Sequence, residues 1–207
     1  MSDKILRIVL TGAPCGGKST TIKTLSKLHS DVYCVPEVAS ILLGGGYPAP
    51  DAIHTWNQKW QNRFQSAVAT TQLALENESE ERARNIGARV IIYDRGLLDG
   101  ASYLAGGIAE LEKLTNMTED EMLNRYDVVV HLPTVATKNE NLYEKISNPL
   151  RIEDVNEVLT LEQKVLDAWE RHPNRYIIER EHAVDFINDI IKKHAINLTS
   201  KVKACRV

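Results

Sequence analysis

Residues 12–19 impose the strongest constraint on the fold, because a glycine-rich motif there directly follows a short apolar run. The motif reads Gly-Ala-Pro-Cys-Gly-Gly-Lys-Ser and fits G-x-x-x-x-G-K-[ST] at every fixed position. Such a motif binds phosphate when a strand precedes it and a helix follows, and Ile5–Thr11 and Gly17–His29 predict that strand and that helix. Glycines let backbone N–H groups turn inward around an anion at the positive end of a helix. The predicted contacts come from Gly12, Ala13, Pro14, Cys15, Gly16, Gly17, Lys18, Ser19 and Thr20.

Two side chains of this loop and one from a later strand predict a metal–nucleotide site. Lys18 is placed to reach the β- and γ-phosphates, and the Ser19 hydroxyl is placed to bind Mg²⁺. The third predicted strand, Arg89–Tyr93, is followed directly by Asp94. Because parallel strands present their carboxyl ends at one edge of the sheet, we expect Asp94 beside Ser19, holding Mg²⁺ directly or through water. The alternative is that Asp94 caps the segment that starts near Gly96.

Glu37 and Arg95 are candidates for the acceptor side of the same edge. Glu37 follows the second predicted strand, Val32–Pro36, where a carboxylate is suited to take a proton from an acceptor hydroxyl. The plainer interpretation is a favourable acid in the first turn of the next helix. Arg95 is suited to clamp a phosphate or the substrate, and its alternative is an ion pair with Asp99, four residues further on.

Short β-branched runs alternate with longer helical stretches, which is typical of an α/β protein with a parallel sheet covered by helices. The fourth and fifth strands are expected at Asp127–Leu132 and Arg175–Glu179. Helices are expected over Thr55–Asn85 (one long helix or two abutting ones), from a capping box at Thr118, and over Val155–Arg171 and Ala183–Ile196.

Composition excludes several classes of protein. The 207 residues carry 25 Lys and Arg against 28 Asp and Glu, a net charge of −3, which argues against a dedicated nucleic-acid binder. Three cysteines without metal-ligand spacing and no apolar stretch of membrane length favour a reduced, cytoplasmic protein. We expect one domain over residues 1–198 and a basic tail over 199–207. The basic end from Lys192 is interpreted as solvated, with contact to an anionic membrane surface as the alternative.

Three motifs together resemble a known family. They are Gly-Ala-Pro-Cys-Gly-Gly-Lys-Ser, Val-Pro-Glu-Val-Ala and Asp-Arg-Gly-Leu-Leu-Asp. The chain resembles P-loop NTPases of the nucleoside and nucleotide kinase branch, in an AAA-domain group. That group includes the ribosylnicotinamide kinase half of the bacterial NAD-biosynthesis regulator. It also includes the N-terminal domain of the TRPL translocation defect protein, which looks like a GTP- and phosphoinositide-binding regulator.

The resemblance implies a fold and further site residues. It implies the three-layer P-loop NTPase fold, with a five-stranded parallel sheet in the order 2-3-1-4-5. It also implies a mobile lid, for which Thr134–Glu153 is the candidate, with Arg151 as a phosphate contact. Kinases of this branch read a base with a glutamine at the place of Gln65, whose amide offers a donor and an acceptor together. Asp99 is a further candidate for substrate binding, and Trp60 is more typical of core packing than of base stacking.

The leading hypothesis is a Mg²⁺-dependent phosphotransferase that uses ATP, or GTP, and a nucleoside-like or other small-molecule acceptor. Its catalytic candidates are Lys18, Glu37, Asp94, Arg95 and Arg151. The alternative is a nucleotide-dependent regulatory switch (an ATPase or GTPase) with slow hydrolysis, of which a phosphoinositide-associated module is one form. A mechanical AAA+ ATPase is disfavoured because too little chain follows the fifth strand for a helical subdomain. We expect a monomer or a homodimer.

Overall fold

A computed structural model describes residues 4–138 and 155–204. Its strands form one five-stranded sheet in the order β2-β3-β1-β4-β5, and all neighbouring strands are parallel. This confirms the predicted order 2-3-1-4-5. The strands are β1 (Leu6–Thr11), β2 (Val32–Val35), β3 (Val90–Asp94), β4 (Val128–His131) and β5 (Arg175–Ile177).

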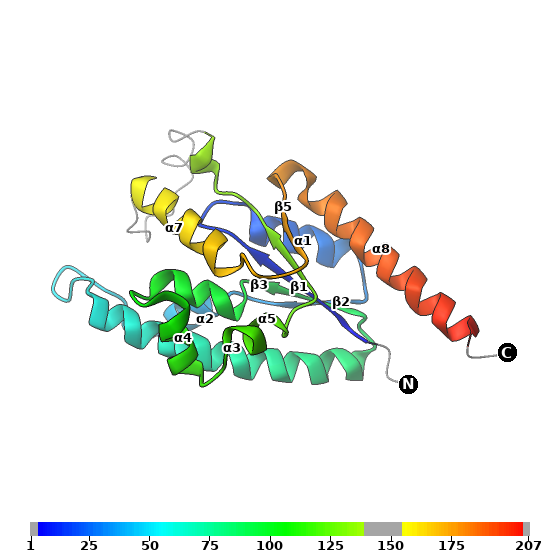
Figure 1. The fold of residues 1–207 in the computed structure, drawn as a ribbon, viewed down its shortest axis with the longest axis horizontal. Helices are drawn as coiled ribbons and strands as arrows, with labels where there is room; N and C mark the ends of the chain where they lie inside the picture. The colour runs from blue at the N-terminus through cyan, green and yellow to red at the C-terminus, as the bar shows by residue number, and fades with distance from the viewer. Residues whose placement is uncertain (1–3, 139–154, 205–207) are drawn as a thin grey trace.

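Helices cover both faces of the sheet, as the alternating pattern predicted (Figure 1). One face packs against α1 (Lys18–Leu28) and α8 (Arg180–Ala204). The other face packs against most of the remaining elements. These are α3 (Gln58–Ile86), the 3₁₀ segments η1 (Leu97–Tyr103) and η2 (Val135–Thr137), α4 (Gly107–Thr115), α5 (Glu119–Leu123) and α7 (Val155–Ala168). A short helix, α2 (Val38–Gly44), follows β2 and contacts α3.

The central strands are apolar on both faces because helices cover both. Every residue of β3 and β4 is buried, which explains why these strands read as continuous apolar runs. The edge strand β5 differs, since Ile177 is 55% exposed. All five strands lie where the sequence predicted them, with ends that shift by at most two residues.

The helices show where local patterns were sufficient and where they were not. The stretch predicted at Thr55–Asn85 is a single helix that starts at Gln58, because the Asn57 side chain accepts the N–H of Trp60 and caps it. The capping box at Thr118 is confirmed. The end predicted for the last helix at Ile196 is wrong, since α8 continues to Ala204 and so extends into the predicted tail.

None of the helices within residues 4–138 and 155–204 combines the length and the apolar character needed to cross a bilayer.

Helices α2 and α4 and the segment η1 were not predicted. They are short, and α4 begins at the second glycine of a Gly106-Gly107 pair, where the sequence pattern favours a turn.

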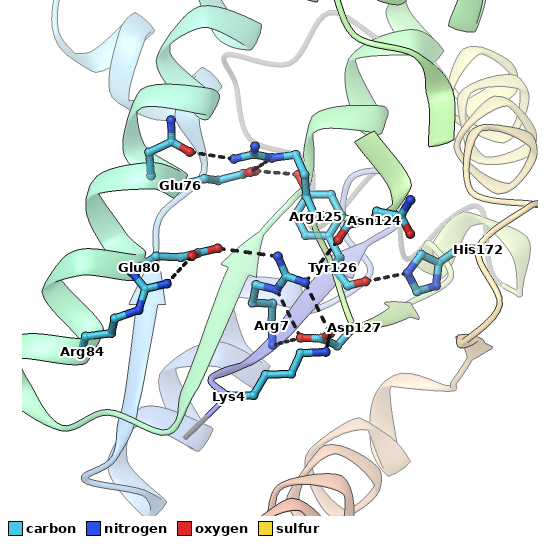
Figure 2. A network of polar contacts seen from close by, with 11 residues as sticks. Lys4, Arg7, Glu76, Glu80, Arg84, Asn124, Arg125, Tyr126, Asp127 and His172 are labelled. Atoms are coloured by element: carbon cyan, nitrogen blue, oxygen red, sulfur yellow. Dashed lines mark hydrogen bonds and ion pairs between the residues drawn. The ribbon is translucent and has the colours of Figure 1, made fainter. Parts of the chain in front are cut away.

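A buried carboxylate on α3 joins three parts of the fold (Figure 2). Glu76, only 2% exposed, accepts the Tyr126 hydroxyl and the Arg125 Nε–H, both at 2.6 Å. The Tyr126 oxygen in turn accepts the backbone N–H of Leu97 at 2.7 Å. These contacts tie α3 and the segment before β4 to the start of η1, so they fix the backbone that follows Asp94.

Replacing Glu76 with alanine is expected to destabilise the fold by about 3 kcal/mol, because it leaves the Arg125 charge and the Tyr126 hydroxyl without their buried partner. Urea denaturation followed by circular dichroism measures this loss. Glu78→Ala, an exposed acid on the same helix, is the matched control and should change the free energy of unfolding by less than about 0.5 kcal/mol. Equal stability of the two variants would contradict the assigned role of Glu76.

Candidate active site at the carboxyl edge of the sheet

The loop between β1 and α1 has the backbone conformation that its glycines predicted. The φ angle is positive at Gly12 (120°), Cys15 (65°) and Gly17 (89°). A Cβ on Gly12 would lie 2.2 Å from the carbonyl oxygen of Leu132, so no other residue fits beside the end of β4. Alternating right- and left-handed backbone turns successive N–H groups toward one point, which is the arrangement that an anion requires.

Lys18 lies inside this loop. Its Nζ donates to the carbonyl oxygens of Gly12 at 2.7 Å and Ala13 at 2.9 Å. Burial, and then repulsion from Arg95, lower the pKa of Lys18 from 10.5 to about 8. The ammonium is thus held at the loop by two carbonyl groups, and an anionic ligand offers it stronger partners.

Ser19 and Asp94 lie together, as predicted from the edge where their strands end. The Ser19 Oγ donates to Asp94 Oδ2 at 2.9 Å. Burial, with the nearby charge of Glu37, raises the pKa of Asp94. The capping alternative for Asp94 finds no support, because the N-cap residue of η1 is Gly96.

This pair fits a magnesium ion shared with a nucleotide. Mg²⁺ takes oxygen ligands and usually keeps several waters, bound by one or two protein groups and by phosphates. A hydroxyl and a carboxylate within hydrogen-bond distance match that ligand set. No cluster of three or more His, Cys, Asp or Glu side chains suited to a metal occurs within residues 4–138 and 155–204, so the described part of the chain offers no complete protein cage.

Glu37 and Arg95 form an ion pair beside the loop. The Arg95 Nε donates to Glu37 Oε1 at 2.6 Å, and its Nη1 donates to the carbonyl oxygen of Gly12 at 3.1 Å. Burial alone would raise the pKa of Glu37, but Arg95 and the Ser40 hydroxyl hold it at about 2. Glu37 is also the N-cap residue of α2, without a side-chain capping bond. The carboxylate is therefore ionised and is held by Arg95 beside the loop.

Asp99 lies behind Arg95 and is 3% exposed. Its Oδ1 accepts the Thr11 hydroxyl at 2.6 Å and the Arg95 Nη1 at 3.1 Å. Its Oδ2 accepts the N–H of Gly96 at 3.0 Å and the indole N–H of Trp169 at 3.3 Å. The ion pair that was the alternative for Arg95 is present, and both carboxylate oxygens are bonded within the protein. Substrate contact by Asp99 stays a prediction.

The remaining predicted site residues are Gln65, Thr20, Trp60 and Arg151. Gln65 is buried on α3, with its amide oxygen 3.4 Å from where a Cβ on Gly100 would stand. Thr20 is exposed on the first turn of α1. Trp60 stacks on Phe64 with ring centroids 4.9 Å apart, which agrees with packing. Arg151 and most of the predicted lid lie outside the described residues.

Sequence reasoning missed three residues that hold the loop from the side of α7. The N–H of Ala13 donates to Glu162 Oε2 at 2.8 Å, and Glu162 Oε1 lies 2.7 Å from His131 Nε2. The Thr134 hydroxyl donates to the carbonyl oxygen of Pro14 at 2.6 Å. The sequence held a signal for two of them, a polar residue in an apolar pattern. Glu162 is an acid within the buried stripe of α7, and His131 ends an otherwise apolar strand.

Arg180 is a further residue that no motif indicated. Its Cγ, Cδ and Nε atoms lie within about 3 Å of where a Cβ on Gly17 would stand, so the first residue of α8 covers the phosphate loop. Its neighbour Glu179 pairs with Lys138 at 2.7 Å. The arginine therefore brings a guanidinium to the loop from the start of α8, just after the edge strand β5.

The lowered pKa of Lys18 predicts a pH-dependent affinity for nucleotide. Below pH 8 the ammonium is already charged; above it, a bound triphosphate must restore the proton, so the dissociation constant should rise by up to about tenfold per pH unit. Titration of a fluorescent Mg-nucleotide between pH 7 and 9.5 measures this. Lys18→Arg, which stays charged, is the control and should give a flat profile. A flat profile in the unmodified chain would contradict the assignment.

A comparison with family models identifies the chain. A model described as an AAA domain matches residues 7–185, a range that contains β2 to β5, all of β1 except Leu6, the phosphate loop and the described residues that surround it. No curated protein matches significantly. Such a P-loop domain implies binding of a nucleoside triphosphate, typically with Mg²⁺, and its hydrolysis or transfer. Because the match covers most of the 207 residues, the chain belongs to this AAA domain family of P-loop NTPases.

Proposed function

We propose that the chain is a Mg²⁺- and ATP-dependent phosphotransferase that acts on a hydroxyl or phosphate of a nucleoside-like small molecule. The observation that carries this proposal is the Glu37–Arg95 ion pair, whose guanidinium also contacts the carbonyl oxygen of Gly12. A domain that only hydrolyses a nucleotide needs the phosphate loop and the metal site, but no carboxylate–guanidinium pair beside them.

On the donor side, the backbone N–H groups of the loop and the Lys18 ammonium hold the phosphates. Lys18 exchanges its two carbonyl partners for phosphate oxygens, which are stronger acceptors because they are charged. Arg180 offers a second cation from the outer side of Gly17. We assign it to the donor nucleotide, together with Arg151 as predicted from the sequence.

The balance of charge supports a divalent cation. Four carboxylates surround the loop, those of Glu37, Asp94, Asp99 and Glu162, against three cations, Lys18, Arg95 and, on the outer side of Gly17, Arg180. A polyanionic nucleotide approaches such a site favourably only with its own cation. Bound Mg²⁺ would neutralise charge on the transferring phosphoryl group, and Ser19 and Asp94 are the residues that would hold it.

On the acceptor side, Glu37 accepts the hydroxyl proton as the acceptor oxygen bonds to the γ-phosphorus, while the bond from that phosphorus to the bridging oxygen breaks and the nucleoside diphosphate leaves. Its low pKa makes it a weak base at rest, and a substrate that draws Arg95 toward its phosphoryl group strengthens it by removing the compensating charge. Arg95 then stabilises charge on the group in transfer. Gln65 is assigned to the acceptor, in line with the resemblance to the nucleoside and nucleotide kinase branch, and Asp99 keeps Arg95 in place.

The direct test is release of nucleoside diphosphate from Mg-ATP and from Mg-GTP. Each is measured with and without a panel of nucleosides, nucleoside monophosphates and nicotinamide riboside. Stimulation well above the acceptor-free rate, lost in Lys18→Ala, identifies a kinase and its acceptor class. Tight binding with slow, acceptor-independent release would instead favour the regulatory switch.

Glu37→Gln is expected to lower the acceptor-stimulated rate by about 100-fold or more, because the amide cannot take the proton. Binding of Mg-nucleotide should change much less than the rate, since Glu37 reaches the loop only through Arg95 and through its charge near Lys18. Asp51→Asn, which removes an exposed carboxylate from the loop after α2, is the control and should leave both quantities unchanged. Full acceptor-stimulated turnover in Glu37→Gln would exclude it as the base.

A further inference from the structure

Two consecutive residues of the phosphate loop are held from the side of α7 by a group of three side chains, which we call the clasp: His131, Thr134 and Glu162. The clasp takes the N–H of Ala13 through Glu162 at 2.8 Å and the carbonyl oxygen of Pro14 through Thr134 at 2.6 Å. It therefore holds the loop by its backbone, through groups other than the carbonyl oxygens of Gly12 and Ala13 that Lys18 holds.

The clasp is buried and ionised. Glu162 is 5% exposed and His131 is fully buried. Burial alone would raise the pKa of Glu162, but the hydrogen bond and charge of His131, with the Ala13 N–H, lower it. An ionised carboxylate only accepts hydrogen bonds, so His131 Nε2 carries the proton and donates it at 2.7 Å.

Such a pair is a poor device for stability. A buried carboxylate is costly even when it is hydrogen-bonded, and apolar side chains of similar volume often stabilise a core as well or better; the neighbours of Glu162 on the same face of α7 are apolar. In addition, His131 Nδ1 is buried without a hydrogen bond to any residue in the ranges 4–138 and 155–204. The fold therefore accommodates a polar atom without a hydrogen bond, His131 Nδ1, and a buried charge, that of Glu162. This points to a role other than packing.

The geometry indicates what that role is. Lys18 and Arg95 hold the carbonyl oxygens of Gly12 and Ala13, and a triphosphate competes for both cations. When Lys18 donates to phosphate instead, the loop loses the hydrogen bonds from Lys18 to the carbonyl oxygens of Gly12 and Ala13. The Ala13 N–H is donated to Glu162 and is therefore not free for a phosphate, and the clasp keeps Ala13 and Pro14 in place in both situations.

We propose that Glu162, oriented by His131, is a positioning residue of the phosphate loop that sets nucleotide affinity through the backbone of Ala13 without touching the ligand. This inference rests on nucleotide binding at the loop, as the proposed function does, but not on the nature of the acceptor. His131 fixes which way the carboxylate points, and Thr134 holds the adjoining peptide.

The sign of the effect separates positioning from simple electrostatics. Glu162 places a negative charge beside a loop that binds an anion, so its removal alone would strengthen nucleotide binding. If the carboxylate instead positions the loop, Glu162→Gln must weaken binding although it removes a repulsive charge. The two accounts predict opposite changes in one measured dissociation constant.

The experiment uses the full chain and measures the dissociation constants of Mg-ATP and Mg-GTP at pH 7 by equilibrium titration. For Glu162→Gln we expect binding roughly tenfold weaker, since the Ala13 N–H then has only a neutral amide oxygen as its acceptor in place of a charged carboxylate. Thr134→Val, which keeps the shape but removes the hydroxyl, should weaken binding several-fold by a route that leaves the charge unchanged. Asp167→Asn removes a carboxylate from the exposed face of the same helix and is the matched control, expected to bind as the unmodified chain does.

The outcomes are distinct. Circular dichroism at the titration temperature establishes that each variant is folded, and Thr134→Val carries the test if Glu162→Gln is not. Weaker binding in folded Glu162→Gln and Thr134→Val, with Asp167→Asn unchanged, supports the positioning role. Unchanged or tighter binding in Glu162→Gln overturns it. Failure of the unmodified chain to bind either nucleotide would count against the proposed function, and is read before any variant.

Discussion

The buried carboxylate of Asp99 is the interaction on which the geometry of the site depends. Its oxygens accept hydrogen bonds from Thr11 at the end of β1, from Trp169 after α7 and from Arg95 after β3. A buried carboxylate is costly unless it is bonded in this way, so the three donors remain together. Arg95 is thereby fixed between Gly12 and Glu37. The Asp99 carboxylate thus determines how far Glu37 lies from the phosphate loop.

The charged groups of the site are bonded to one another, and this determines how a ligand binds. Lys18 holds loop carbonyls, Ser19 holds Asp94, and Arg95 holds Glu37. Binding of a metal–nucleotide then exchanges partners more than it creates new bonds, and such exchanges contribute little net free energy each. The affinity for nucleotide therefore depends on how firmly the backbone of the phosphate loop keeps its shape while these side chains change partners. This is the role proposed for the clasp.

Most of the fold follows from local patterns, and the exceptions have physical causes. Strands such as β3 are apolar on both faces, and α5 carries its own capping box, so neither depends on distant residues for recognition. The segment η1 has no period of its own; it forms because Asp99 takes the N–H of Gly96 and the Tyr126 hydroxyl takes that of Leu97. Helix α8 runs past its predicted end at Ile196, where the basic composition favoured a tail.

The sequence by itself determined the phosphate loop and the Ser19–Asp94 pair, because covalent spacing places Lys18 and Ser19 at the start of a helix and parallel strands end at one edge. Only the tertiary structure decided the partners of these groups. Glu162 reaches Ala13 across 149 positions of the chain, and Thr134 reaches Pro14 across 120. No local pattern encodes such contacts, since they depend on how α7 and the end of β4 pack against the loop.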